Sequence, residues 1–369
     1  MKIYYIMILW IIVLAVLARM SPEFFYVFEN GKYKIRTGMA LIAMLFIAVI
    51  IGLRNSVGDT SAYISIYNDL PTNISADFFA KYTKDRGFFV LSALFKRFVS
   101  TDFHWWLLVI AIICGIAIVK TLKDYSDNFF FSLFLFITMT HYVWMLNGMR
   151  QFIAVSIIFL NLKYIKERRF IPYVIFALLL ASIHITALIM IPAYFIGTSK
   201  PWGKRFWLFI ILMLVVGMSM DFIAERFSYV LEDSAYEGYL TAAANSTGSN
   251  LLRTFAAAAP PILATFCYKY VNNENDPVVN MSVNFSFVSA ILYFCSAQSG
   301  GILIGRLPIY FDIYNLLLLP WLVEHCFNKS SKKVMYILLA ICYLLFFYYK
   351  VKIGMNMGYS SDILGLNYQ

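Results

Sequence analysis

Residues 147–151 read NGMRQ and separate two strongly apolar segments, 129–146 and 152–162. Polar side chains inside membrane segments are costly, so they usually face a bundle interior or a watery cavity. On a continuous helix, spacings of three and four residues put four positions on one face: Asn147, Arg150, Gln151 and Ala154. Because a guanidinium fork matches the oxygens of an anion, we expect Arg150, beside Asn147 and Gln151, to bind an anionic substrate.

A single histidine, His184, interrupts the apolar segment 176–190. Small residues at helical spacing around it, such as Ala181 and Ala187, permit close helix packing. One interpretation is a histidine hydrogen-bonded within the bundle, and the other is a general base that accepts a proton from a substrate hydroxyl. We expect His184 to be that base, with Asp59 as the competing candidate.

The composition is that of a membrane protein. Hydrophobic residues make up 61% of the 369 residues and charged residues only 14%, whereas soluble domains carry roughly 25% charged residues. The formal net charge of +10 fits the basic bias of cytoplasmic loops, so no nucleic-acid partner is expected. We predict an all-α, polytopic integral membrane protein with about 10–12 transmembrane helices, built as one transmembrane domain over residues 1–369.

Ten apolar segments are predicted to cross the membrane: 3–20, 37–54, 103–120, 129–146, 150–165, 206–223, 251–270, 281–302, 307–326 and 334–350. The segment 172–196 allows two interpretations. It is either one long helix broken near Pro192 or a hairpin of two short legs that turns near His184. The choice decides on which side of the membrane the following segments lie.

Counting basic residues favours an N-terminus outside the membrane and a hairpin at 172–196. That topology brings Arg54, Arg150 and Arg306 to one outer surface, where we expect them to face a common cavity. For each arginine the alternative is a side chain that anchors a helix end. Pro308 fits the first turn of a new helix, so Arg306 is expected beside the positive end of a helix, a favourable place for phosphate.

Two outer segments are predicted, 55–102 and 224–250. In the first, Asp59 is expected to cap a short helix that carries Tyr63 at the membrane interface, and 86–98 is expected to be an amphipathic helix lying on the bilayer. The second holds tyrosines beside carboxylates, a composition that suits either contact with sugars or a membrane interface.

Several catalytic motifs are absent from the sequence: the D-x-D pair, H-E-x-x-H, the P-loop and G-x-S-x-G. The five cysteines show no metal-binding or disulfide spacing. We therefore expect no metal and no cofactor, and an enzyme built on this chain would rely on positioning, arginine electrostatics and one proton acceptor. A lipid-diphosphate donor suits such a site, because its leaving group carries its own charge.

The chain resembles the EpsG-like, Wzy-type bacterial polysaccharide polymerases in four ordered motifs: RNSVGDTSAY (54–63), RGFF (86–89), NGMRQ (147–151) and SIHITA (182–187). GRLPIYF (305–311), followed by Leu319 and Pro320, is similar to the C-terminal signature of that family. The similarity covers roughly residues 40–325. The family's usual acidic residue before a Gly-Tyr-like pair is represented here by Asp85-Arg86-Gly87-Phe88, a modest departure from the family pattern.

The resemblance implies a GT-C-like, metal-independent glycosyltransferase in a bacterial inner or cytoplasmic membrane. It would polymerise undecaprenyl-diphosphate-linked oligosaccharide repeat units into O-antigen, capsule or exopolysaccharide, with an active site that faces outward. Membrane lipids, a chain-length regulator and a flippase are the other partners that it implies. The expected catalytic residues are His184, Asp59 and Arg150. The expected substrate-binding residues are Arg54, Arg306, Asn147, Gln151, Tyr63 and Tyr310.

Two other classes of function remain open on the sequence. A flippase or transporter would also hold an anionic glycolipid with arginines, although transporters usually show paired halves with similar interrupted helices. A ligase that moves a finished glycan to another acceptor would share almost the whole site.

Overall fold

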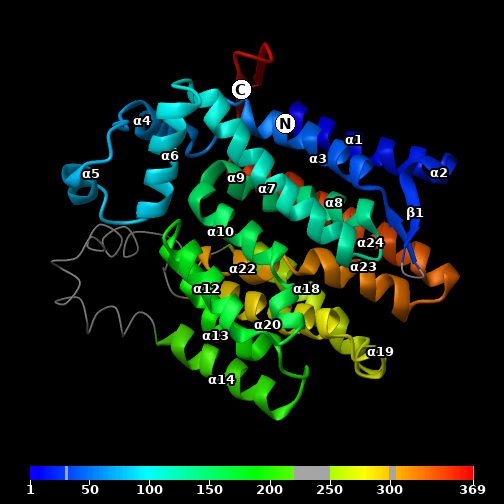
Figure 1. The fold of residues 1–369 in the computed structure, drawn as a ribbon. Helices are drawn as coiled ribbons and strands as arrows, with labels where there is room; N and C mark the ends of the chain where they lie inside the picture. Colours follow the sequence, from blue (N-terminus) through cyan, green and yellow to red (C-terminus); the bar gives the residue numbers. More distant parts are fainter. Residues whose placement is uncertain (30–31, 220–249, 299–304, 369) are drawn as a thin grey trace. The chain divides into compact units, whose positions relative to one another are not determined.

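The computed structural model describes residues 1–29, 32–219, 250–298 and 305–368 (Figure 1). The chain forms two compact units. Unit 1 comprises Met1–Ile191 and Ile341–Gln369, and unit 2 comprises Pro192–Ala340. Except for Asn250, the expected outer segment 224–250 lies outside the described residues.

Unit 1 is mostly helical. Its longer helices are α1 (Lys2–Met20), α3 (Thr37–Gly52), α6 (Arg86–Phe98), α7 (Phe103–Tyr125), α8 (Phe129–Thr138), α10 (Met149–Leu160) and α12 (Phe170–Ala181). Its shorter helices are α2 (Pro22–Phe25), α4 (Thr60–Asn68), α5 (Ala76–Lys81), η1 (His141–Val143), α9 (Trp144–Asn147), α11 (Lys163–Lys166) and η2 (Ile185–Ile189). The helix α13 (Met190–Gly197) begins in unit 1 and ends in unit 2.

Two antiparallel hairpins in unit 1 modify the all-α expectation. The first pairs β1 (Tyr26–Glu29) with β2 (Lys32–Ile35), in the register Tyr26 to Ile35. The second pairs β3 (Tyr359–Ser361) with β4 (Leu366–Tyr368), in the register Ser360 to Asn367. It follows the π-helix η3 (Tyr349–Gly354) at the end of the chain.

Small residues bring α3 and α7 into close contact. A Cβ added to Gly52 would lie 2.5 Å from the Cα atom of Leu108, and one added to Gly115 would lie 2.8 Å from Met44. Small residues allow such close approach between membrane helices. The packed pair fixes the end of α3, from which the loop to α4 starts.

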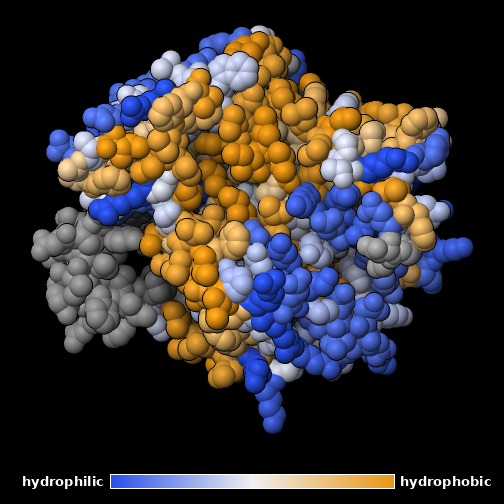
Figure 2. All heavy atoms as spheres, viewed as in Figure 1, coloured by the Kyte–Doolittle hydropathy of each residue, from blue (hydrophilic) through white to orange (hydrophobic). Residues whose placement is uncertain are grey.

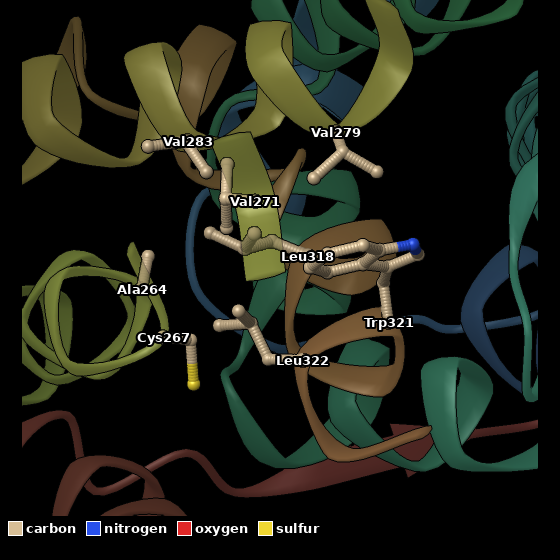
Figure 3. Packing of buried hydrophobic residues seen from close by; sticks show 8 residues of the cluster. All are labelled: Ala264, Cys267, Val271, Val279, Val283, Leu318, Trp321 and Leu322. Carbon is tan, nitrogen blue, oxygen red and sulfur yellow. The ribbon is translucent and has the colours of Figure 1, made fainter. Parts of the chain in front are cut away.

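Unit 2 has its own core. Its helices are α14 (Lys204–Met218), α18 (Leu251–Phe266), α19 (Tyr268–Glu274), α20 (Pro277–Gln298), α22 (Ile309–Asp312), α23 (Asn315–Cys326) and α24 (Lys329–Tyr348), the last of which continues into unit 1. Figure 3 shows one buried cluster where residues of α18 and α19 meet α20 and α23, among them Ala264, Val283 and Leu322. The side chains are aliphatic or small, apart from Trp321 at one end of the cluster.

Several helices are broken where the sequence predicts continuous segments. The helix from α8 to α9 bends by 58°, and Gly148 separates α9 from α10 with φ −145° and ψ 44°. In the segment 172–196 the break lies at Ser182–His184, where His184 is extended. The interpretation with a break near Pro192 is therefore wrong, because that residue lies inside α13.

The described residues contain four helices that are long and apolar enough to cross a membrane, or up to six if each of two bent pairs is one span. Further apolar helices of 10–17 residues are also present, including α3, α10 and α12. Large apolar side chains are exposed on several of the apolar helices, among them α3, α7 and α12, and Figure 2 shows them spread over α7 and over α12. Such surfaces are typical of contact with lipid. The mostly helical, polytopic membrane class is thus confirmed; the shorter helices account for fewer long spans than the about 10–12 expected.

Candidate functional site

A buried carboxylate, Asp85, joins the two residues that dominate the sequence argument. Its Oδ2 accepts a hydrogen bond from Nη1 of Arg150 at 2.8 Å, and it lies 3.2 Å from Nδ1 of His184. The Asp85 side chain is 6% exposed, whereas those of Arg150 and His184 are 27% and 21% exposed. Both partners therefore keep a surface that a substrate can reach.

The local backbone explains how Asp85 reaches this place. Asp85 is the N-cap of α6 and adopts a left-handed conformation with φ 50°. Two residues later the Gly87 amide donates to the Ser182 carbonyl at 2.8 Å. A Cβ on Gly87 would lie 2.3 Å from the Ser182 hydroxyl oxygen. Glycine thus lets the start of α6 dock onto the break that precedes His184.

Arg150 lies in the first turn of α10, directly after the break at Gly148. Its guanidinium carbon is 5.9 Å from the ring centroids of both Phe88 and Phe89, a distance at which cation–π attraction is significant. The two rings and Asp85 hold the guanidinium in place from α6. Because only Nη1 contacts Asp85, the group is oriented by one carboxylate oxygen and not by a bidentate pair.

The contact to Asp85 also assigns roles to the His184 nitrogens. An ionised carboxylate only accepts hydrogen bonds, so Nδ1 carries the proton in this contact. In the neutral ring Nε2 is then the acceptor. This is the tautomer that a general base requires when a carboxylate orients it.

A second cluster surrounds Arg54, and there the guanidinium is engaged with the protein. Its Nε donates to Thr60 Oγ1 at 2.7 Å, Nη1 to the Ile51 carbonyl at 2.6 Å and Nη2 to the Met145 carbonyl at 3.2 Å. The residue is 1% exposed. In this structure Arg54 ties the end of α3 to α4 and α9, instead of facing a cavity with Arg150 as expected.

Asn147 joins the same loop. Its Oδ1 accepts a hydrogen bond from the Asp59 amide at 3.1 Å. Gly58, with φ +53°, lies so close to the Asn147 side chain that an added Cβ would be 1.4 Å from Asn147 Oδ1. The motif around Gly58 and the motif around Asn147, distant in sequence, therefore form one contact.

Several expected site residues lie elsewhere than predicted. The break at Gly148 interrupts the helix that was to place Asn147 and Arg150 on one face, so that expectation is wrong. Asp59 is exposed and caps α4, as expected, although its side chain makes no capping hydrogen bond. Gln151 and Tyr63 are 2% and 6% exposed, which places both in the packed interior.

The remaining two residues belong to unit 2. Arg306 is exposed, and Tyr310 is 1% exposed. The expected segment 307–326 is not one helix, because it divides into α22 and α23. Since α22 has only four residues, little helix dipole is available to Arg306, and the phosphate argument loses that support.

Sequence reasoning missed the position of Asp85 between Arg150 and His184. It noted the residue only as a departure within the resemblance to known polymerases. No local pattern marks it, because its two partners are 65 and 99 residues away.

A comparison with family models completes the description of the site. The model of the EpsG family matches residues 39–361, and this range includes both clusters. The chain belongs to the EpsG family. This family is linked to exopolysaccharide biosynthesis, so this EpsG-family chain is a membrane protein of polysaccharide biosynthesis. No curated protein and no solved structure gave a match.

Proposed function

We propose that this EpsG-family protein is a metal-independent glycosyltransferase. It joins oligosaccharide repeat units carried on a polyprenyl diphosphate into a bacterial surface polysaccharide, at a site that faces the outer side of the membrane. The observation that supports this most is the single carboxylate of Asp85 between Arg150 and His184. It combines an anion-binding group with an oriented proton acceptor at one place.

In the proposed reaction an acceptor hydroxyl attacks the anomeric carbon of the donor sugar. Nε2 of His184 takes the hydroxyl proton as the new carbon–oxygen bond forms, and the bond to the donor phosphate breaks. Asp59 is the alternative base, because it is exposed beside the loop that contacts Asn147. Asp85 is a positioning residue that keeps the histidine in the required tautomer.

The leaving group is the polyprenyl diphosphate, on which negative charge grows as the bond breaks. Arg150 is the cation of unit 1 that we assign to this charge, since its guanidinium is oriented and still partly exposed. Arg306, exposed in unit 2, stays the second candidate for a phosphate contact. A carrier phosphate needs no nucleotide-binding motif, in agreement with the sequence.

Reconstitution with a lipid-linked repeat unit tests the proposal. Purified protein in vesicles is expected to produce a ladder of longer lipid-linked saccharides, and His184→Ala is expected to abolish it while the protein still folds. If His184→Ala retains the ladder and Asp59→Asn loses it, the base is Asp59.

Other products would identify another activity. Movement of the lipid-linked unit across the vesicle without elongation would indicate a flippase. Transfer that requires a second, different acceptor would indicate a ligase. In either case the polymerase proposal fails.

A further inference from the structure

The C-terminal hairpin and the loop after α3 enclose a cavity of about 420 Å³ in unit 1. The loop contributes Ser56, Val57 and Gly58, and the hairpin contributes Ser360 and Asn367, among others. In Figure 1 the hairpin is the red segment at the C-terminus, next to the end of α3. The volume of the cavity is in the lower part of the range typical of small-molecule pockets.

Strand-like pairing builds the cavity. The Asn55 amide donates to the Ser360 carbonyl at 2.8 Å, and the Ser360 amide donates to the Ser56 carbonyl at 3.2 Å. The Asn55 side chain makes two contacts with Asp362: its Nδ2 donates to Asp362 Oδ2, and its Oδ1 accepts from the Asp362 backbone amide, each at 2.7 Å. Tyr359 anchors the hairpin through its hydroxyl to the Ile50 carbonyl at 2.7 Å. The walls are therefore held at fixed positions.

The groups in the wall define the chemistry of the ligand. Among the described residues, the lining holds the hydroxyls of Ser56 and Ser360, which hydrogen-bond to each other at 2.7 Å, the amide of Asn367 and the carboxylate of Asp362, and no lysine or arginine. Such a lining lacks the cations that a phosphate would need. It offers both donors and acceptors, which suits a neutral ligand with several hydroxyl groups.

The cavity is linked to the candidate site through the contact between Gly58 and Asn147. Gly58 lines it and, on the same turn, packs against Asn147. Asn147 is three residues before Arg150, whose guanidinium is bound to Asp85. A saccharide in the cavity would thus lie beside the turn at Gly58, which contacts Asn147 just before the helix break that precedes Arg150. The strand β4 lies beyond residue 361, where the family match ends, so half of the hairpin is not described by the family model.

We propose that this cavity is a saccharide-binding subsite, which holds one sugar of the glycan by hydrogen bonds to its hydroxyls. The proposal rests on the proposed function for its choice of glycan. Asn367 is the most informative residue, because it is exposed and pairs in register with Ser360 across the hairpin. Neither residue belongs to the Asp85 cluster.

The test measures binding without turnover. Full-length protein in nanodiscs is applied to an array of neutral and acidic bacterial oligosaccharides that lack the lipid diphosphate, with empty nanodiscs as the blank. The wild type is expected to bind a subset of neutral oligosaccharides. Asn367→Ala is expected to raise the dissociation constant about three- to tenfold, the effect of one lost hydrogen bond. Asn367→Trp is expected to abolish binding, because the larger side chain fills the cavity.

Ile363→Trp is the matched control, because Ile363 lies in the turn of the same hairpin, is 53% exposed and does not line the cavity. It is expected to bind as the wild type does. Absence of any saccharide binding by the wild type, or full binding by Asn367→Trp, would overturn the subsite. Elongation assays on the same preparations separate the two proposals. If the wild type elongates saccharides and Asn367→Trp does so with the same kinetics, only the subsite is refuted. If the wild type binds saccharides but does not elongate them, only the polymerase is refuted.

Discussion

Asp85 contacts two functional groups through one oxygen atom, so its charge affects both of them. Asp85→Asn keeps the size of the side chain but removes that charge. Hydrogen bonds to charged groups contribute about 1.5–3 kcal/mol, which corresponds to a roughly 10- to 100-fold loss of kcat. Elongation kinetics check this, and Asp85→Glu is expected to restore part of the activity.

Glu167→Gln is the control for that experiment, because the Glu167 side chain is half exposed and forms an ion pair with a surface arginine, Arg169, at 3.7 Å. Its kinetics are expected to match those of the wild type. If Asp85→Asn elongates saccharides as fast as this control, Asp85 does not position the reacting groups.

Arg150 is expected to act through the geometry of its fork as well as through its charge. Lysine supplies a point charge without planar bidentate donors and cannot reproduce the contacts with Asp85, Phe88 and Phe89. Loss of one oriented donor to a developing charge costs roughly 10²–10³ in kcat. Arg150→Lys is therefore expected to lose this factor, whereas Arg97→Lys on the exposed side of α6 keeps its activity. Equal turnover by both variants would remove Arg150 from the mechanism.

The loop between α3 and α4 depends on one glycine. Gly58→Ala places a methyl group 1.4 Å from Asn147 Oδ1 at φ +53°, so the contact between the two motifs has to open. Gly365→Ala provides the matched control, because Gly365 has φ +62° and nothing within 4 Å of its added Cβ. Both variants carry the cost of a left-handed alanine, about 1–2 kcal/mol.

Thermal unfolding in detergent separates the two contributions at this turn. Gly58→Ala is expected to lower the midpoint clearly more than Gly365→Ala, because only Gly58 meets a side chain. A shift of the same size in both variants would mean that the packing against Asn147 contributes nothing to stability.

Breaks between helices coincide with the candidate residues. Gly148 precedes Arg150, and the non-helical residues Ser182–His184 expose His184 between α12 and η2. Non-helical backbone at membrane depth is tolerated where it is buried in protein or lines a watery cavity. At these breaks the side chains of Arg150 and His184 can point in directions that a continuous helix would not allow.

Contacts within unit 1 also bear on the topology of the whole chain. Asn55 and Ser56 are hydrogen-bonded to Ser360, so residues 55 and 360 lie on the same side of the membrane. This requires an even number of crossings between them. With the other predicted segments unchanged, only the hairpin interpretation of 172–196 gives an even number. The contact thus supports the hairpin interpretation of 172–196, which the count of basic residues combines with an outer N-terminus.

Cysteine accessibility tests that topology. In a background without the five native cysteines, of which Cys342 is exposed, Ser61→Cys and Gly305→Cys are expected to react with a membrane-impermeant maleimide from outside. Glu167→Cys follows the predicted segment 150–165, which the same topology directs to the inner side, and it is expected to react only after the membrane is permeabilised. Labelling of Ser61→Cys and Gly305→Cys from opposite sides would contradict the predicted common outer surface.

The sequence by itself determined the membrane class and the EpsG-like motifs, and it singled out Arg150 and His184 as candidate catalytic residues. Those conclusions rest on composition, on apolar length and on residues close together in the chain, which local physics governs. It did not determine the helix breaks at Gly148 and at Ser182–His184, because apolar content alone does not set where a helix ends.

Only the tertiary structure decided which residues act together. It buried Arg54 among carbonyl groups and placed Asp85 between Arg150 and His184. It also packed Gly58 against Asn147 and joined Asn147 to the amide of Asp59, which lies 88 residues away in the sequence. The physical reason is that one short hydrogen bond or one missing Cβ fixes each of these contacts, and such a contact leaves no periodicity in the chain from which it could be read.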